Sequence, residues 1–164
     1  FEGAPTDNWN FTATPAKYNF PSGEDFWTDT TVTPQIAPFA DARYWFMQDL
    51  ENPNGGFAGF HTLDFQTIDL AGLNAGLVSF SYWTTEYEAG DSLGYILHFD
   101  NDTTWNLANY VDLNRNTGSW QLVQYPVPPG STHVRLRLMA KQNGGAPTGQ
   151  ASMRCKSRKV CRLR

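Results

Sequence analysis

Alternation of apolar and polar residues in steps of two constrains the fold of this 164-residue chain more than any other feature. Successive side chains of an extended strand point to opposite faces, so such alternation is typical of a half-buried strand. It predicts five strands in the middle and later parts of the chain: Leu63 to Leu70, Leu77 to Trp83, Ser92 to Asp100, Trp120 to Val127 and Thr132 to Lys141.

Turn-forming residues separate these segments, at residues 52–56, 88–91, 114–118 and 128–130. No stretch of ten or more residues has the 3.6-residue apolar period of an amphipathic helix. Many short strands at this spacing predict an all-β fold, an antiparallel two-sheet β-sandwich of the jelly-roll kind. Residues 3–41 are rich in Pro, Thr and Asp, and are interpreted as irregular surface chain with two short strands.

The formal net charge of −4 is unevenly distributed. Residues 151–164 hold six of the twelve Lys and Arg residues and no acid, which leaves six bases against sixteen acids in residues 1–150. Such an acidic body argues against nucleic acid or an anionic membrane as a partner. No apolar run approaches the roughly 20 residues of a membrane-spanning helix, so membrane insertion is not expected. Cys155 and Cys161, without a nearby His, are a weak metal signal.

Two arginines are placed two residues apart in the last predicted strand. Val134, Leu136 and Leu138 alternate with them and are expected to face the core. Arg135 and Arg137 therefore share the opposite face, where two guanidinium groups can hold a carboxylate of a ligand. The favoured alternative is a solvated face on which these arginines pair with carboxylates of the acidic body.

The six tryptophans are candidates for stacking against sugar rings. Most are expected to fill the core, because a sandwich of this size needs large side chains between its sheets. Trp45, Trp83 and Trp120 lie within predicted strands. Trp9 and Trp27 are interpreted as lying in loops, and they are the candidate ligand-binding tryptophans.

Signals for catalysis are weak. Glu86 and Glu88 could present carboxylates about 6–7 Å apart on one strand face, from a rise of about 3.3 Å per residue. That separation suits the acid and base of a glycosidase, but solvated acids beside a turn are the favoured interpretation. Ser92 follows Gly90 and Asp91 in a sequence typical of an esterase family, yet no Asp precedes any His by three residues. No catalytic residue is therefore assigned.

Several segments, in their order, resemble the MAM-like, cleaved-adhesin type of jelly-roll module found in secreted and cell-surface bacterial proteins. They are Phe1 to Gly3, Trp45 to Leu50 with Asn54 to Gly56, His61 to Phe65, Ile68 to Leu70, Leu77 to Trp83, Gly90 to Leu93 and Val134 to Leu138. The resemblance covers about residues 1–145. It implies a non-catalytic module that accompanies extracellular enzymes or acts in adhesion and carbohydrate binding.

The same resemblance implies a structural calcium ion. In that family an opening Glu and an Asp of the closing strand help to hold the ion; Glu2 matches the first, and Asp49 is a weaker candidate from a neighbouring loop. The closing strand is expected to be missing or altered, because the residues that follow Gly145, up to Arg154, show no strand pattern. Calcium is therefore expected to raise the melting temperature only slightly.

Residues 146–164 are interpreted as an aberrant basic tail. The codons GCG CCG ACT GGG CAG GCT TCG ATG CGG would encode residues 146–154. With a preceding G and a shift of one base, the same codons read Gly-Ala-Asp-Trp-Ala-Gly-Phe-Asp-Ala, which matches the closing strand of the family. We therefore interpret residues 146–164 as a frameshifted sequence, which sequencing of the encoding DNA tests.

Together these features predict a secreted or cell-surface bacterial module that binds carbohydrate or protein without catalysis. The chain begins at Phe1 and is interpreted as part of a larger protein. Two alternatives remain open. One is a jelly-roll glycoside hydrolase or polysaccharide lyase that uses Glu86 and Glu88, and the other is a structural spacer domain.

Overall fold

The computed structural model describes residues 11–19, 26–30, 44–48, 50, 59–72, 76–85, 89–100, 104–113, 116–142 and 150–156. For residues 18–19, 26, 28–30 and 150–156 it describes the backbone only. In the described part of the chain, no helix is long and apolar enough to cross a membrane.

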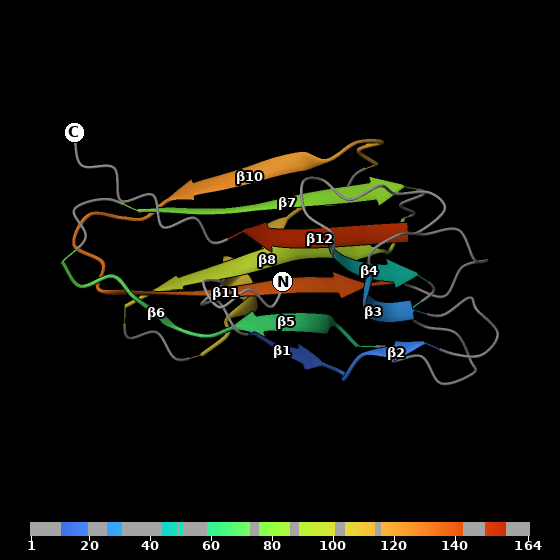
Figure 1. Ribbon diagram of the computed structural model, residues 1–164, viewed down its shortest axis with the longest axis horizontal. Helices are drawn as coiled ribbons and strands as arrows, with labels where there is room; N and C mark the ends of the chain where they lie inside the picture. The colour runs from blue at the N-terminus through green and yellow to red at the C-terminus, as the bar shows by residue number, and fades with distance from the viewer. Residues whose placement is uncertain are drawn as a thin grey trace.

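Two antiparallel sheets form a β-sandwich, and Figure 1 shows one sheet behind the other. Sheet A has the order β1 (Phe11–Thr14), β5 (His61–Phe65), β11 (His133–Lys141), β8 (Ser92–Phe99) and β9 (Val111–Asp112), with β6 (Ile68–Asp69) also paired to β11. Sheet B has the order β10 (Gln121–Pro126), β7 (Leu77–Thr85), β12 (Gln150–Lys156), β4 (Tyr44–Gln48), β3 (Phe26–Thr30) and β2 (Tyr18–Asn19). The predicted fold class is confirmed.

The main core lies between the sheets and is built from alternate residues of their strands. Leu63, Leu136 and Leu138 of sheet A have no exposed surface, and they belong to one cluster with Phe80 and Tyr82 of sheet B. Burying a large apolar side chain contributes about 1.5–3 kcal/mol relative to leaving it in water. The period-two pattern of the sequence therefore places the core correctly.

The strand predictions agree with the structure over β7, β8, β10 and β11 to within two residues at each end. The single strand predicted over Leu63 to Leu70 is instead two short strands, β5 and β6, separated by the exposed Gln66 and Thr67. In the described part of residues 3–41, the structure has three short strands, β1, β2 and β3, where two were expected.

The closing strand, expected to be missing or altered, is not missing, and the expectation that the residues after Gly145 form no strand is wrong. β12 pairs with β7 over residues 150–156 and with β4 over residues 150–153. It thus lies in the interior of sheet B (Figure 1). Without it, the facing edges of β4 and β7 would present unpaired N–H and C=O groups, which are costly to bury.

The sequence of β12 is suited to this position. Polar Gln150, Ser152, Arg154 and Lys156 alternate with Ala151, Met153 and Cys155. The register places the second set opposite Thr84, Tyr82 and Phe80, whose side chains are buried. Alternation and a backbone free of proline suit a strand in the interior of a sheet.

Candidate ligand-binding site

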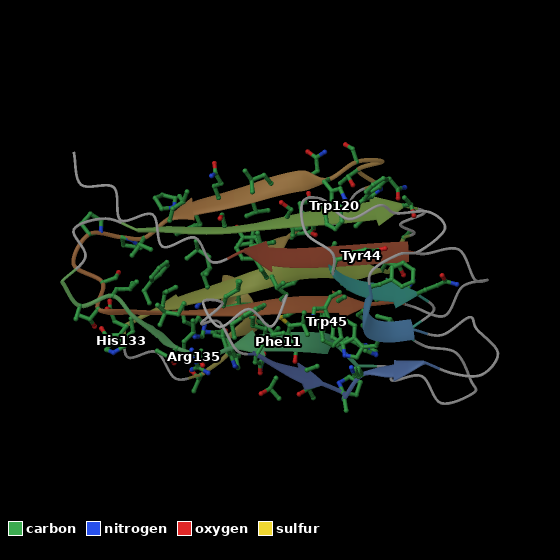
Figure 2. All side chains as sticks on the ribbon, viewed as in Figure 1. Phe11, Tyr44, Trp45, Trp120, His133 and Arg135 are labelled. Carbon is green, nitrogen blue, oxygen red and sulfur yellow. The ribbon has the colours of Figure 1, made fainter. Side chains whose placement is uncertain are left out.

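The face of sheet A that points away from the core carries charged and ring-bearing side chains. Arg135 and Arg137 alternate with the buried Val134, Leu136 and Leu138, so both project from this outer face. The register places Arg135 beside His98 of β8 and Arg137 beside Asp64 of β5. The predicted placement of the two arginines on one face is therefore confirmed. Figure 2 shows Arg135 and His133 near each other at one end of the sandwich.

Trp105 packs against this row from the segment between β8 and the short 3-10 helix η1 (Leu107–Asn109). Its ring centroid is 4.5 Å from the Cζ atom of Arg135 and 4.5 Å from that of Arg137. The ring of His98 lies 4.8 Å away at an interplanar angle of 32°. Guanidinium groups are attracted to the electron-rich face of an indole ring, so the two arginines hold Trp105 in place.

Arg137 also forms a two-point ion pair with Asp64. Its Nε donates to Oδ1 at 2.5 Å and its Nη2 donates to Oδ2 at 2.5 Å. The side chains of Arg137 and Asp64 keep 20% and 27% of their surface exposed. This pair confirms, for Arg137, the expected pairing with a carboxylate of the acidic body, and it fixes the orientation of the guanidinium plane beside Trp105.

The segment that follows Trp105 lies against the same outer face. Asn106 caps η1 by accepting a hydrogen bond from the Ala108 N–H at 2.9 Å. The Tyr110 ring then covers Gly94 of β8, where the Cβ atom of any larger residue would overlap Tyr110 side-chain atoms and the Val111 carbonyl oxygen. Trp105 and Tyr110 thereby cover His98 and Gly94 on the outer side of β8, and His98 is buried although it faces away from the core.

The ends of β8 and β11 are held together next to this site. Asp100 adopts a left-handed backbone with φ of 61°. Its Oδ1 accepts hydrogen bonds from the Thr132 N–H at 2.6 Å and the Thr132 hydroxyl at 3.2 Å. These bonds, the backbone one above all, lower the pKa of the Asp100 carboxyl group. Asp100 therefore fixes the start of β11, the strand that contains Arg135, relative to the end of β8.

The interpretation of Trp27 as a loop residue that stacks on sugars is wrong. Trp27 lies in β3 and has no exposed surface. Its Nε1 donates to the Pro15 carbonyl oxygen at 3.0 Å, and its ring lies 4.7 Å from that of Trp45 and 5.3 Å from that of His61. It is a core residue because β3 pairs with β4 and turns the indole inward. Trp9 lies outside the described residues.

Burial beside Trp27 also changes the acid–base behaviour of His61. The imidazole has no exposed surface, and desolvation lowers its pKa from 6.5 to about 4. A neutral ring is the form that the apolar core accommodates at neutral pH.

The predicted calcium ligands, Glu2 and Asp49, and the carboxylates Glu86 and Glu88 lie outside the described residues. Within the described ranges, no group of three or more His, Cys, Asp or Glu side chains comes together to hold a metal ion.

Sequence patterns do not distinguish Trp105 from the tryptophans expected in the core. Periodicity predicts which strand residues share a face, but a residue in a connecting segment has no period to follow. The available signal is that Trp105 stands among polar residues shortly after the predicted strand Ser92 to Asp100. In the structure this strand, β8, pairs with the strand that contains the two arginines.

Comparison with known proteins shows similarity of fold without similarity of sequence. No family model matches the chain, and no curated protein matches it. The carbohydrate-binding module TmCBM61, solved in complex with β-1,4-galactotriose, is 10% identical, with 90% of this chain and 84% of that one covered and a TM-score of 0.50. At this identity the likeness concerns the sandwich fold alone.

Cleaved adhesin domains, the type that the sequence resembles, are among the similar structures. The K1 domain of Lys-gingipain from Porphyromonas gingivalis W83 is 16% identical over 90% of this chain and 87% of that one, with a TM-score of 0.48. The K3 domain of the same protein is 17% identical over 90% and 88%, with a TM-score of 0.40.

Proposed function

We propose that this chain is a secreted, non-catalytic module that binds a glycan on the outer face of sheet A. The binding site is centred on Trp105, with Arg135, Arg137 and Asp64 around it. A single observation carries the proposal: one partly exposed indole ring is in contact with two guanidinium groups, one of which is oriented by a carboxylate.

The chemistry of these groups suits a sugar ring. The C–H face of a sugar is apolar and packs on an aromatic ring, while its hydroxyl groups need hydrogen-bond donors and acceptors at the edge of that ring. Arg135 and Arg137 supply donors and Asp64 supplies acceptors. Because Trp105 is already held by cation–π contacts, little side-chain entropy is lost when a ligand settles on it.

A protein ligand is the alternative in the same class. Leu107 and Val111 keep 61% and 41% of their surface exposed on the segment next to Trp105. Apolar side chains of this kind fit the surface of another protein. A hydrolase or lyase acting through Glu86 and Glu88 and a passive spacer domain are the remaining alternatives, and a screen of polysaccharide degradation with Glu88→Gln as control tests the enzyme.

A panel of soluble oligosaccharides, measured by isothermal titration calorimetry, tests the site. We expect Trp105→Ala to reduce the affinity for the oligosaccharide at least about tenfold. For comparison, the stacking of a nucleic-acid base on an aromatic side chain contributes about 1–3 kcal/mol. Trp105→Phe should retain part of the affinity. Trp120→Ala is the matched control, because Trp120 is a partly buried tryptophan packed against Trp83 and Tyr44 in a separate aromatic cluster.

The control lies far from the site in the fold. Figure 2 shows Trp120 and Tyr44 on one side of the view and Arg135 on the other. Equal loss of affinity in Trp105→Ala and Trp120→Ala would contradict the proposed position of the site. If no oligosaccharide binds while a pull-down recovers a protein through Trp105, the protein-ligand alternative replaces the glycan.

A further inference from the structure

We propose that the glycan bound at Trp105 carries carboxylate groups, as uronic-acid polysaccharides do. This inference rests on the proposed function and names the class of ligand for the same site. It depends on the position of two guanidinium groups over one indole ring. The ion pair between Arg137 and Asp64 shows, within the protein, the kind of contact that a ligand carboxylate would make.

The distribution of charge in the molecule is the first argument. Only six Lys and Arg residues occur in residues 1–150, against sixteen Asp and Glu residues. Two of these six, Arg135 and Arg137, are gathered on the same tryptophan. Although the body as a whole is acidic, two guanidinium groups on one ring give this part of sheet A a local attraction for an anionic group.

The geometry of a uronic acid is the second argument. Its ring presents an apolar C–H face, and its carboxylate projects from the edge of that ring. Such a ligand can contact Trp105 while its carboxylate meets one of the guanidinium groups that lie over the indole. Guanidinium–carboxylate contacts are planar and two-pointed, as Arg137 and Asp64 demonstrate in this face. A neutral sugar would use the ring and make no charge-assisted contact of this kind.

The third argument is the position of the Asp64 carboxylate. It occupies the place next to Arg137 that a ligand carboxylate would otherwise take, and the pair remains partly exposed. Asp64 therefore orients Arg137 and at the same time competes with an anionic ligand. If Asp64 competes with the ligand, removal of its charge should strengthen the binding of an acidic glycan. If Asp64 has only a structural role, removal of its charge should not strengthen that binding.

The test compares trigalacturonate with its methyl-esterified form, which has the same linkages and ring but no charge. Calorimetry at about 50 mM and about 200 mM salt measures both, since charge-dependent binding weakens as salt screens it. We expect trigalacturonate to bind at least about tenfold more tightly than the ester at low salt, and an alginate trimer to behave like trigalacturonate. Arg135→Gln should abolish this preference and retain weak binding to the ester.

Asp64→Asn should increase the affinity for trigalacturonate several-fold relative to the affinity for the ester. Lys141→Gln is the matched control, because Lys141 lies on the same strand about 20 Å from Arg135, from six residues at about 3.3 Å each. It removes one positive charge without touching Trp105. Melting temperatures of all variants separate loss of binding from loss of folding.

Each outcome decides the inference. Equal, Trp105-dependent binding of the acid and its ester would overturn it while leaving the proposed function intact. Failure of every oligosaccharide would instead overturn the proposed function. A sulfated galactose oligomer that binds as tightly as trigalacturonate would overturn the assignment to carboxylate, since it would show that negative charge alone is recognised. Reduced affinity in Asp64→Asn would contradict the competition between Asp64 and the ligand.

Discussion

At the scale of single residues, Gly94 controls how the segment after Trp105 lies on sheet A. The Tyr110 ring occupies the space that a side chain at position 94 would need. We expect Gly94→Ala to lower the free energy of unfolding by about 1–3 kcal/mol, because overpacking displaces the ring or the strand. Urea denaturation measures the change, and Ser92→Ala on the same strand is the control. A loss equal to that of the control would contradict the packing described for Tyr110.

His61 makes stability depend on pH. Its pKa is lowered to about 4 in the folded protein, against 6.5 for an exposed imidazole, so the unfolded chain binds a proton more readily. The contribution is fully present above pH 6.5 and is lost as the pH falls from 6.5 towards 4. Between pH 7 and pH 5 this loss is on the order of 1–2 kcal/mol.

Chemical denaturation at several pH values measures this effect. We expect His61→Gln to show a smaller decrease in the free energy of unfolding over that range than the parent protein. His133→Gln, which removes a histidine from a partly exposed position, should retain the full decrease. The same decrease in all three proteins would show that other groups carry the dependence.

Prediction at the level of residues succeeds where periodicity applies. Arg135 and Arg137 share one face because they alternate with three core residues, and the sequence alone predicts this. Trp27 is predicted wrongly because β3 is only five residues long and its neighbours give no clear alternation. Trp105 escapes prediction because a connecting segment gains its position from contacts made across the sheet, which no local pattern encodes.

At the scale of elements, β12 is held in sheet B by its pairing with β7 on one side and β4 on the other. We expect Ser152→Pro to lower the free energy of unfolding by at least about 3 kcal/mol, because proline removes an N–H and disturbs pairing in the interior of a sheet. Position 152 faces both Trp83 of β7 and Phe46 of β4. Thermal denaturation compares it with Ser152→Ala, which retains the N–H and should be nearly neutral. A mild effect of the proline would contradict the interior position of β12.

The other strands are predicted more accurately the longer their apolar and polar residues alternate. β7, β8, β10 and β11 alternate over six to nine residues, and their predicted bounds agree closely with the structure. The strand β12 is not predicted, because Pro147 and Gly149 stand just before it and its alternation begins only at Gln150. The two-residue strands β2, β6 and β9 are defined by their partners in the sheet, so their sequences alone do not specify them.

At the scale of the whole molecule, two layers with a continuous core follow from the number of alternating strands, whereas their order in the sheets does not. β12 pairs with β7 and β4 although more than sixty residues separate it from either of them. Such long-range pairing is decided by which edges remain to be covered and by the fit of the core, and these are properties of the assembled sandwich.

The response of the whole protein to calcium is the last prediction. The resemblance implies an ion held in part by an Asp of the closing strand, but residues 150–156, which form the last strand of the described chain, contain no acid and carry Arg154 and Lys156. A ligand present at 100 times its Kd stabilises a fold by about 2.7 kcal/mol, equivalent to about 5–10 °C in Tm for a domain of this size. We expect 5 mM calcium (roughly that excess for a site of Kd near 50 μM) to raise Tm by less than about 1 °C relative to EDTA. A rise of about 5 °C or more, measured by calorimetry, would show that residues outside the last strand complete the site, and Glu2→Gln would then be expected to remove the rise.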